Sequence, residues 1–264
     1  MNISDVSKTA ILTLISRVTG AERKKPIIND PMAVLCLEKL LSIVSEEEKH
    51  WILKAKKMFA GILAHDINTL IKRVKYFDKI TDDYISNNPS CMVISLACGF
   101  DTRFWRINNK NYKYIELDLP EVIALKKELL KEQINYELIG CSVLDLSWID
   151  KVTINGNSNF LIIAEGIFMY LPKQDVLSLF QVISQRFNDS QITLEMAHEK
   201  YTKGLLKRIV HWYFKKFYGL EVTYVFGIKK PKDIESYGKG LKVIDIGKGQ
   251  VGPLITASIN SNVK

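Results

Sequence analysis

Two carboxylates stand directly after predicted strands, where they could bind a polar ligand. Asp118 follows the predicted strand 112–117, and Glu165 follows the almost wholly apolar run 160–164. A carboxylate accepts two charge-assisted hydrogen bonds from a cis-diol, which is how proteins hold the ribose of a nucleoside. Asp118 also lies nineteen residues past Gly99, close to the spacing of about 20 residues between a glycine turn and a ribose-binding acid. The pair predicts a nucleoside site.

Each carboxylate also has a structural explanation. Asp118 could cap a helix that starts near Pro120, and Glu116 stands two residues earlier on the same strand as a second candidate for the ribose. A glutamate that leaves a buried strand is costly unless it is paired. The partner of Glu165 could therefore be a ligand amine or sulfonium, or the cation of a lysine or arginine.

Gly99 follows the apolar run 92–97 and allows the backbone to turn sharply and approach a ligand closely. The segment lacks the further glycines of a GxGxxG turn, which would let a pyrophosphate lie on a helix N-terminus. This counts against NAD or FAD. It is consistent with a cofactor that has no phosphate.

The elements that position these residues are short strands separated by helical segments. We expect strands at 92–97, 112–117, 134–139, 160–164 and 191–196, with helices at 119–131 and 172–186 between them. This alternation predicts βαβ units, an α/β fold and a doubly wound, mostly parallel sheet. Ligands of such sheets bind outside the carboxyl ends of the strands, where Gly99, Asp118 and Glu165 fall.

The two ends of the chain differ from this middle part. Helical periodicity at 9–21, 31–43, 51–63 and 68–84 predicts a helical N-terminal cap over residues 1–89. The runs 241–246 and 254–259 predict a C-terminal antiparallel hairpin at the sheet edge. An aromatic-rich insertion at about 197–237 could cover a pocket or be core. With no linker or repeat visible, we expect residues 1–264 to be a single domain, with the α/β core at 90–264.

Composition limits the partners. The net charge of +8 is spread over scattered lysine pairs, which favours a solvated surface over a nucleic-acid partner. Four separated cysteines without a CxxC pair argue against a disulfide framework and a metal site, and favour the reducing cytoplasm. The apolar runs are far shorter than the roughly 20 residues of a membrane span. We therefore expect no membrane partner; the oligomeric state is left open.

Three segments together carry a family resemblance. They are LACGFDTRFWR at 96–106, YIELDLPEVIALK at 114–126 and AEGIFMYLP at 164–172. The chain resembles the leucine carboxyl methyltransferase family, including its bacterial branch of polyketide-type O-methyltransferases, over roughly residues 5 to 260. The resemblance implies a seven-stranded class I methyltransferase fold with S-adenosyl-L-methionine as cofactor.

The resemblance also implies roles for single residues. Gly99 would line the methionyl part of the cofactor and Asp118 would hold its ribose. Glu165 would lie beside the cofactor at a strand end. Arg73, unless it is an ordinary surface arginine, would reach the cofactor carboxylate from the helical cap. The adenine would be flanked by two further residues, Asp145 and Leu146.

The acceptor is less defined. The family's carboxyl methyltransferases commonly have an arginine after the Asp-Leu pair, whereas this chain has Ser147. This argues against the C-terminal carboxylate of a protein as acceptor and favours a carboxylate or hydroxyl oxygen of a small molecule. Tyr170, Arg103 and Arg106 are the candidates for orienting it, and His198 would be the base for a phenol.

The reaction would be an in-line displacement at the sulfonium methyl, and an ionised carboxylate acceptor would need no base. The alternatives are a protein C-terminal carboxyl methyltransferase, a nucleic-acid methyltransferase and a non-catalytic module that binds S-adenosyl-L-methionine.

Overall fold

The computed structural model describes residues 5–153 and 159–260 and confirms the predicted α/β fold. Five parallel strands and two antiparallel ones form a seven-stranded sheet in the order β3-β2-β1-β4-β5-β7-β6. The parallel strands are β1 (Met92–Leu96), β2 (Lys113–Asp118), β3 (Glu137–Gly140), β4 (Phe160–Ala164) and β5 (Ser190–Glu195). The predicted C-terminal hairpin is β6 (Leu241–Lys248) and β7 (Pro253–Ile259), and β6 is the edge strand.

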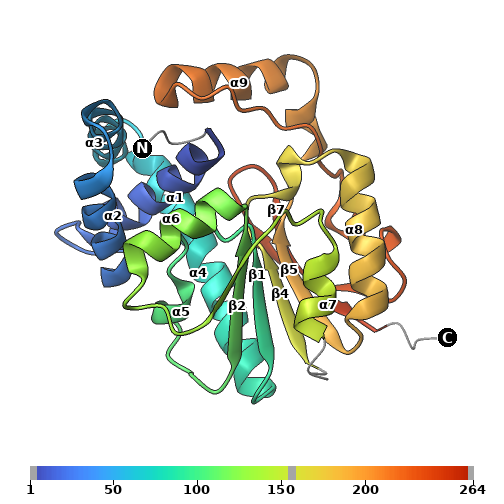
Figure 1. Cartoon of the computed structure of the whole chain (residues 1–264). Helices are drawn as coiled ribbons and strands as arrows, with labels where there is room; N and C mark the ends of the chain where they lie inside the picture. Colours follow the sequence, from blue (N-terminus) through green and yellow to red (C-terminus); the bar gives the residue numbers. More distant parts are fainter. Residues whose placement is uncertain (1–4, 154–158, 261–264) are drawn as a thin grey trace.

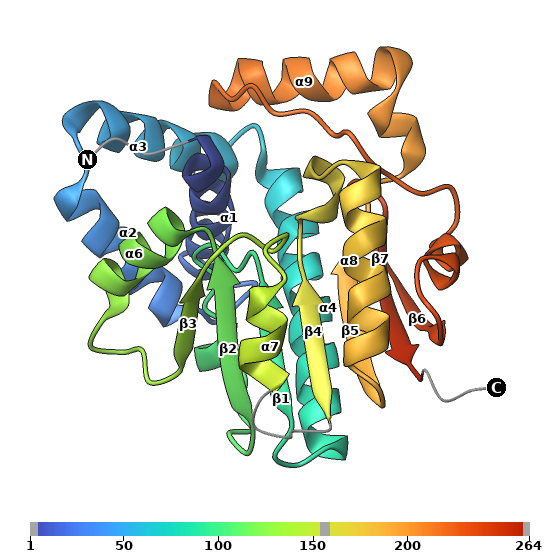
Figure 2. The ribbon, with the colours of Figure 1, turned by 45° about the vertical axis from the view of Figure 1, so that its right-hand side comes forward.

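Strand order reverses between β1 and β4, which are direct neighbours in register from Met92 opposite Phe160 to Leu96 opposite Ala164. Chain connections leave such a pair in opposite directions, so the strand ends open a crevice between them. The segments that begin at Ala97 and Glu165 therefore emerge side by side. Figure 2 shows these carboxyl ends pointing toward the helix α9 (Gly204–Tyr218).

Four helices form the predicted cap, namely α1 (Asp5–Ala21), α2 (Pro31–Ile43), α3 (Glu46–Ala60) and α4 (Ala64–Asn87). Local signals set their starts. Asp30 accepts a hydrogen bond from the amide of Ala33, and Pro31 occupies the first turn of α2. Ser45 and Glu48 form a capping box that starts α3 five residues earlier than the periodicity predicts.

The two faces of the sheet are buried by different helices. Ile162 of β4 packs with α7 (Ser147–Thr153) and α8 (Lys173–Arg186). Leu161 and Ile163 point to the opposite face, where they pack with residues of α4. Because both faces are covered, β4 is wholly buried, as its continuous apolar sequence predicts. A third cluster joins α1–α4 to α6 (Pro120–Leu130), so the cap shares its core with the α/β part.

The predicted aromatic insertion contains the 15-residue helix α9 (Gly204–Tyr218) between two short 3-10 helices, η2 (Glu199–Thr202) and η3 (Pro231–Ser236). Figure 1 shows α9 lying across the top of the molecule, above the strand ends. The periodicity did not predict α7 or the short helix α5 (Arg103–Arg106), because neither is long enough to show a helical repeat. In residues 5–153 and 159–260, no helix has the length and apolar character needed to cross a membrane.

Candidate active site

A cavity of about 700 Å³ lies between the carboxyl ends of the strands and α9. This size is typical of sites for small molecules and cofactors. Its floor comes from the segments after β1 to β5, its walls from α1 and α4, and its far side from α9 and the chain that follows. Of the sequence-predicted site residues, those that line the cavity are Arg73, Gly99, Arg103, Asp118, Glu165 and Tyr170.

Gly99 and Asp118 form the first corner of this floor. The amide of Gly99 donates to Oδ2 of Asp118 over 2.6 Å, and the amide of Leu119 donates to Oδ1 over 2.7 Å. Gly99 has a φ of +52°, and a Cβ there would stand 3.0 Å from Cβ of Ala10. The position therefore favours glycine for both its backbone conformation and its close contact with α1. Burial raises the pKa of Asp118, and the two amides partly offset that effect.

The other candidate for the ribose, Glu116, is not among the cavity-lining residues of the described chain. It is fully buried and pairs with Nζ of Lys126 over 2.6 Å, while the hydroxyl of Tyr136 donates to it over 3.1 Å. The carboxylate of Glu116 therefore neutralises the buried ammonium group of Lys126. Asp118 is the carboxylate at the end of β2 that faces the cavity.

Arg73 of α4 joins the ends of two strands. Its Nε lies 2.9 Å from Oε1 of Glu165, and its Nη1 lies 2.8 Å from Oε2 of Glu195. Burial alone would lower the pKa of Arg73, but the two carboxylates raise it well above its usual value. Arg73 is thus a largely buried, fully charged group and not a surface arginine. Its third nitrogen, Nη2, has no described partner and remains available to an anion at the cavity.

Glu195 was not singled out in the sequence, although it lies at the carboxyl end of a predicted strand, near the place where Glu165 follows its own strand. It is 1% exposed at the end of β5, and burial raises its pKa despite the nearby charge of Arg73. Its Oε1 has no hydrogen-bond partner among the described residues. Such a group needs a partner or a proton. Glu195 is therefore a further candidate functional residue.

Arg103 and Arg106 are held by an internal network of carboxylates. Nη2 of Arg103 lies 2.6 Å from Oε2 of Glu165, so Glu165 has arginine partners on both oxygens. An arginine was one of the possible partners that the sequence left open for Glu165. Arg106 pairs with Asp78 over 2.7 Å and with Asp30 over 2.9 Å. Arg103 still borders the cavity, whereas Arg106 is not among its described lining residues. The geometry gives Arg106 a place in the structural network and no access to the cavity.

The electrostatics of this network centre on Asp101, which pairs with Arg103 over 2.7 Å and with Arg106 over 3.1 Å. Burial favours the protonated form of Asp101, but the arginines outweigh it and hold its pKa well below the usual range. The ion pairs fix the segment after Gly99 to the cap through Asp30 and Asp78. They position the floor of the cavity.

The pair Asp145 and Leu146 lies away from the cavity. Both side chains are exposed, and Oδ1 of Asp145 accepts a hydrogen bond from the amide of Ser147 over 3.1 Å. The segment after β3 that lines the cavity is 141–143 instead. The family resemblance placed the Asp-Leu pair beside the adenine, but the pair directly precedes α7 and its side chains are exposed.

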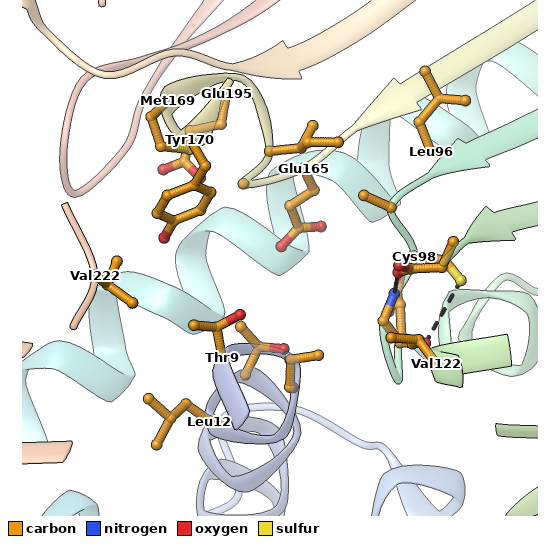
Figure 3. Close-up of a pocket in the computed structure, with 18 of the residues that line it drawn as sticks. Thr9, Leu12, Leu96, Cys98, Val122, Glu165, Met169, Tyr170, Glu195 and Val222 are labelled. Carbon is orange, nitrogen blue, oxygen red and sulfur yellow. Dashed lines mark hydrogen bonds between the residues drawn. The ribbon is translucent and has the colours of Figure 1, made fainter. Parts of the chain in front are cut away.

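Tyr170 and Glu165 point into the same part of the cavity, with Thr9 and Leu12 of α1 on its other side (Figure 3). The rings of Tyr170 and Tyr224 lie 5.5 Å apart. The surrounding protein and the charge of Glu195 raise the pKa of Tyr170 to about 12. Its hydroxyl is therefore a neutral hydrogen-bond donor at physiological pH.

Aromatic residues that sequence reasoning left undecided form the far side of the cavity. They come from α9 and the segment after it, and comprise Tyr213, Phe214, Tyr218 and Tyr224. The hydroxyl of Tyr213 donates to Asp66 of α4, and Nε1 of Trp51 donates to the carbonyl of Tyr218 over 2.8 Å. The insertion therefore covers the pocket. His198 instead accepts a hydrogen bond from the amide of Lys200 and is not among the described lining residues.

This arrangement agrees with the comparison to known families. The leucine carboxyl methyltransferase family matches residues 10–184, which include the cap and the first four strand ends. The chain belongs to the leucine carboxyl methyltransferase family. As a member of this family it is an S-adenosyl-L-methionine-dependent methyltransferase with a class I fold.

Relatives within and near the family cover most of the chain. The tetracenomycin polyketide synthesis O-methyltransferase TcmP of Streptomyces glaucescens is 26% identical over 243 residues, which are 92% of this chain and 82% of that protein. The S-adenosyl-L-methionine-dependent methyltransferase dpfgK of Gibberella zeae is 21% identical over 250 residues, with the same coverage. A solved O-methyltransferase family protein from Burkholderia thailandensis has a TM-score of 0.51 at 10% identity, covering 88% of this chain and 72% of that one. The last likeness supports the fold.

Proposed function

We propose that this methyltransferase transfers a methyl group to an oxygen atom of a small, largely apolar acceptor that binds under α9. The observation that carries the proposal is one continuous cavity that extends from the strand-end carboxylates to the aromatic side of α9. The name of TcmP, a polyketide synthesis O-methyltransferase, supports a small-molecule acceptor.

The cavity residues fit the cofactor. Asp118 would accept hydrogen bonds from the ribose hydroxyls, and the free Nη2 of Arg73 would bind the methionyl carboxylate. Gly99 would leave room for the methionyl chain, and the segment 141–143 would border the adenine. When bound, S-adenosyl-L-methionine supplies an electrophilic methyl group on a positively charged sulfur. Glu165, held by Arg73 and Arg103, would lie beside that charge.

The charges in the cavity favour a hydroxyl acceptor over a carboxylate. The lining carboxylates of the described chain are Asp66, Asp101, Asp118, Glu165, Glu195 and Glu221, and the lining cations are Arg17, Arg73 and Arg103. The arginines all lie on the strand-end side, where carboxylates or a backbone carbonyl already hold them. An acceptor carboxylate under α9 would therefore be desolvated with no free cation to pair with, which is unfavourable.

A hydroxyl acceptor needs a group to take its proton. Glu195 lines the cavity beside Tyr170, and its raised pKa reflects a carboxylate that gains from protonation. We propose that Glu195 accepts this proton and that Tyr170, through its neutral hydroxyl, orients the acceptor oxygen. Catalysis also comes from exclusion of water by α9 and from positioning of the reacting groups, which can lower the activation barrier by about 7–11 kcal/mol.

The fold and the cysteines bear on the domain organisation and the cellular compartment of the enzyme. We propose that the cap and the α/β part act as one methyltransferase domain, since they share a hydrophobic core. All four cysteines are free, which supports the reducing cytoplasm as its compartment.

A turnover assay tests the proposed reaction. The protein is incubated with S-adenosyl-L-methionine carrying a deuterated methyl group and a panel of apolar phenols and aromatic carboxylic acids. Mass spectrometry detects methylated products, and alkaline hydrolysis separates esters from ethers. We expect alkali-stable ethers. Esters would overturn the hydroxyl assignment, and the absence of any product across both halves of the panel would overturn the small-molecule acceptor.

A further inference from the structure

The helix α9 is held to the rest of the molecule by few buried contacts. Of its fifteen residues, only Tyr218 at its end is buried. By comparison, α8 has one residue fewer and buries five, because it packs along the sheet. Figures 1 and 2 both show α9 set apart from the other helices, across the strand ends.

One face of α9 lines the cavity. Phe214 and Tyr218 recur at a spacing of four residues and line the cavity, together with Tyr213. Residues three or four apart lie on the same face of a helix, so these rings define its inner face. The opposite face has no partner among the described residues to explain its composition.

The outer face carries a stripe of exposed apolar side chains. Leu205 is 70% exposed, Ile209 46% and Trp212 52%. Their spacing of four and three residues places them along one line of the helix, and Lys216 continues that line four residues later. Nζ of Lys216 lies 4.6 Å from the ring centre of Trp212. Isolated exposed apolar residues are common, but an ordered row on one helix marks an interaction surface.

The charge within α9 has one sign, although Lys203 and Lys215 pair with the flanking Glu199 and Glu221. Between Glu199 and Glu221 the chain contains no acidic residue and six basic ones, namely Lys200, Lys203, Lys207, Arg208, Lys215 and Lys216. Arg208 and Lys216 are exposed on the same side as Trp212. A row of Leu, Ile and Trp flanked by lysine and arginine is the pattern of helices that lie in a membrane interface.

We propose that the outer face of α9, formed by Leu205, Arg208, Ile209, Trp212 and Lys216, binds an anionic lipid surface. The helix lies in the plane of the surface, with the apolar stripe at the boundary between headgroups and acyl chains and the basic side chains at the headgroups. The sequence led us to expect no membrane partner, because it holds no apolar run of spanning length. That reasoning concerns spanning and does not apply to a helix that lies on a surface.

The charge argues against a second copy of this chain as the occupant. Two α9 faces brought together would juxtapose two sets of basic residues on chains that each carry a net charge of +8. An anionic bilayer instead neutralises them, and its headgroups attract each basic residue near the surface. The proposal does not depend on which acceptor the cavity binds.

Vesicle flotation with the full-length protein tests this proposal. The probes are vesicles of phosphatidylcholine alone and of phosphatidylcholine mixed with phosphatidylglycerol. We expect binding to the mixed vesicles, little binding to phosphatidylcholine alone, and release as salt rises. Absence of binding to the mixed vesicles at low salt would overturn the proposal, and so would equal binding to both kinds of vesicle.

Matched variants assign the binding to α9. Leu205→Ser with Trp212→Ser should weaken binding at least about tenfold by removing two apolar side chains, and Arg208→Gln with Lys216→Gln should weaken it about tenfold by removing two charges. The controls on β6 are Ile244→Ser with Ile246→Ser, which are 50% and 52% exposed, and Lys242→Gln with Lys248→Gln. Equal losses in the controls would overturn the assignment to α9.

A fluorescence measurement remains informative if a variant folds poorly. Trp212 is the most exposed of the four tryptophans, so mixed vesicles should shift its emission to the blue. Trp212→Phe keeps an aromatic ring and should keep the binding while losing most of the shift. An undiminished shift in Trp212→Phe would contradict the proposal. Analytical ultracentrifugation without lipid completes the test, since a dimer that the α9 variants dissociate would identify the face as a contact between copies.

Discussion

Nη1 of Arg73 lies 2.8 Å from Oε2 of Glu195, across 122 residues of sequence. The same guanidinium binds Glu165 through Nε over 2.9 Å. One side chain of the helical cap thus holds the carboxylates that end β4 and β5. This contact fixes the wall of the cavity and makes the cap part of the site.

Removal of Arg73 should therefore be costly. Arg73→Met leaves the buried Glu195 without a cation and removes one of the two arginines that pair with Glu165, and we expect a loss of about 3–5 kcal/mol in the free energy of unfolding, as is usual when a buried ion pair is broken. Urea denaturation measures this loss. Arg186→Met is the matched control, because Arg186 pairs with Asp150 at the surface and such pairs contribute about 0–1 kcal/mol. Similar losses in both variants would contradict the structural role of Arg73.

Glu195 predicts a pH dependence with a defined sign. Its pKa is raised in the folded state, so the folded protein binds this proton more tightly than the unfolded chain and loses stability as pH rises through the folded pKa. Glu195→Gln removes that dependence. Relative to wild type, the variant should gain stability as pH rises above the ordinary glutamate pKa of about 4.5, measured by thermal unfolding across pH.

Glu199 supplies the control with the opposite sign. A hydrogen bond from Lys203 lowers the pKa of Glu199, so its charged form stabilises the fold above the ordinary glutamate pKa. Glu199→Gln should lose stability relative to wild type as pH rises toward about 4.5, below the range in which Glu195→Gln gains it. If the stability of both variants changed with pH in the same direction relative to wild type, the pKa of Glu195 would not be raised in the folded protein.

Tyr170 should act on the acceptor and not on the cofactor. Because its pKa is raised to about 12, its hydroxyl remains a donor over the usable pH range. Tyr170→Phe should lower kcat/KM for the acceptor about tenfold, the effect of one lost hydrogen bond, with the dissociation constant of S-adenosylhomocysteine unchanged. Tyr201→Phe, at a tyrosine outside the cavity lining, is the control. A weakened cofactor affinity in Tyr170→Phe would show that the hydroxyl contacts the cofactor and not the acceptor.

Substitution of Gly166 tests whether the floor of the cavity has room for a Cβ. Its φ is +73°, and a Cβ there would lie 3.6 Å from Nη1 of Arg73 and 3.7 Å from Oε2 of Glu195. Gly219 has a φ of +68° with no atom within 4 Å of such a Cβ. Alanine at either position should cost about 1–2 kcal/mol for the left-handed backbone. Because both distances at Gly166 are ordinary van der Waals contacts, Gly166→Ala should leave the cofactor affinity unchanged in calorimetry, and a weaker affinity would show that the cofactor occupies this space.

Local sequence determined the elements that carry the site. Pro31 and the apolar period predict α2 with its observed bounds, and the uninterrupted apolar run predicts β4 with its observed bounds. Because parallel strands end at one edge of a sheet, Gly99, Asp118 and Glu165 were expected together, and they line one cavity.

The partners of the arginines could not be read from local sequence. Arg103 and Arg106 are three residues apart on α5 and face the cap, where Asp30 and Asp78 come from distant segments. Which carboxylates meet them depends on the tertiary packing of the cap against the strand ends. The same holds for α9, since amphipathic periodicity does not distinguish a helix that covers a cavity from one that packs in the core.

Calorimetric titration with S-adenosylhomocysteine tests the central claim most directly. The claim is that the corner formed by Gly99 and Asp118 holds the ribose of the cofactor. The wild-type protein should bind one equivalent, and Asp118→Ala should weaken binding by about 10- to 100-fold, the effect of losing charge-assisted hydrogen bonds. Asp150→Ala, at an exposed carboxylate far from the cavity, should leave the affinity unchanged. Wild-type affinity in Asp118→Ala, or no binding by the wild-type protein, would contradict the account.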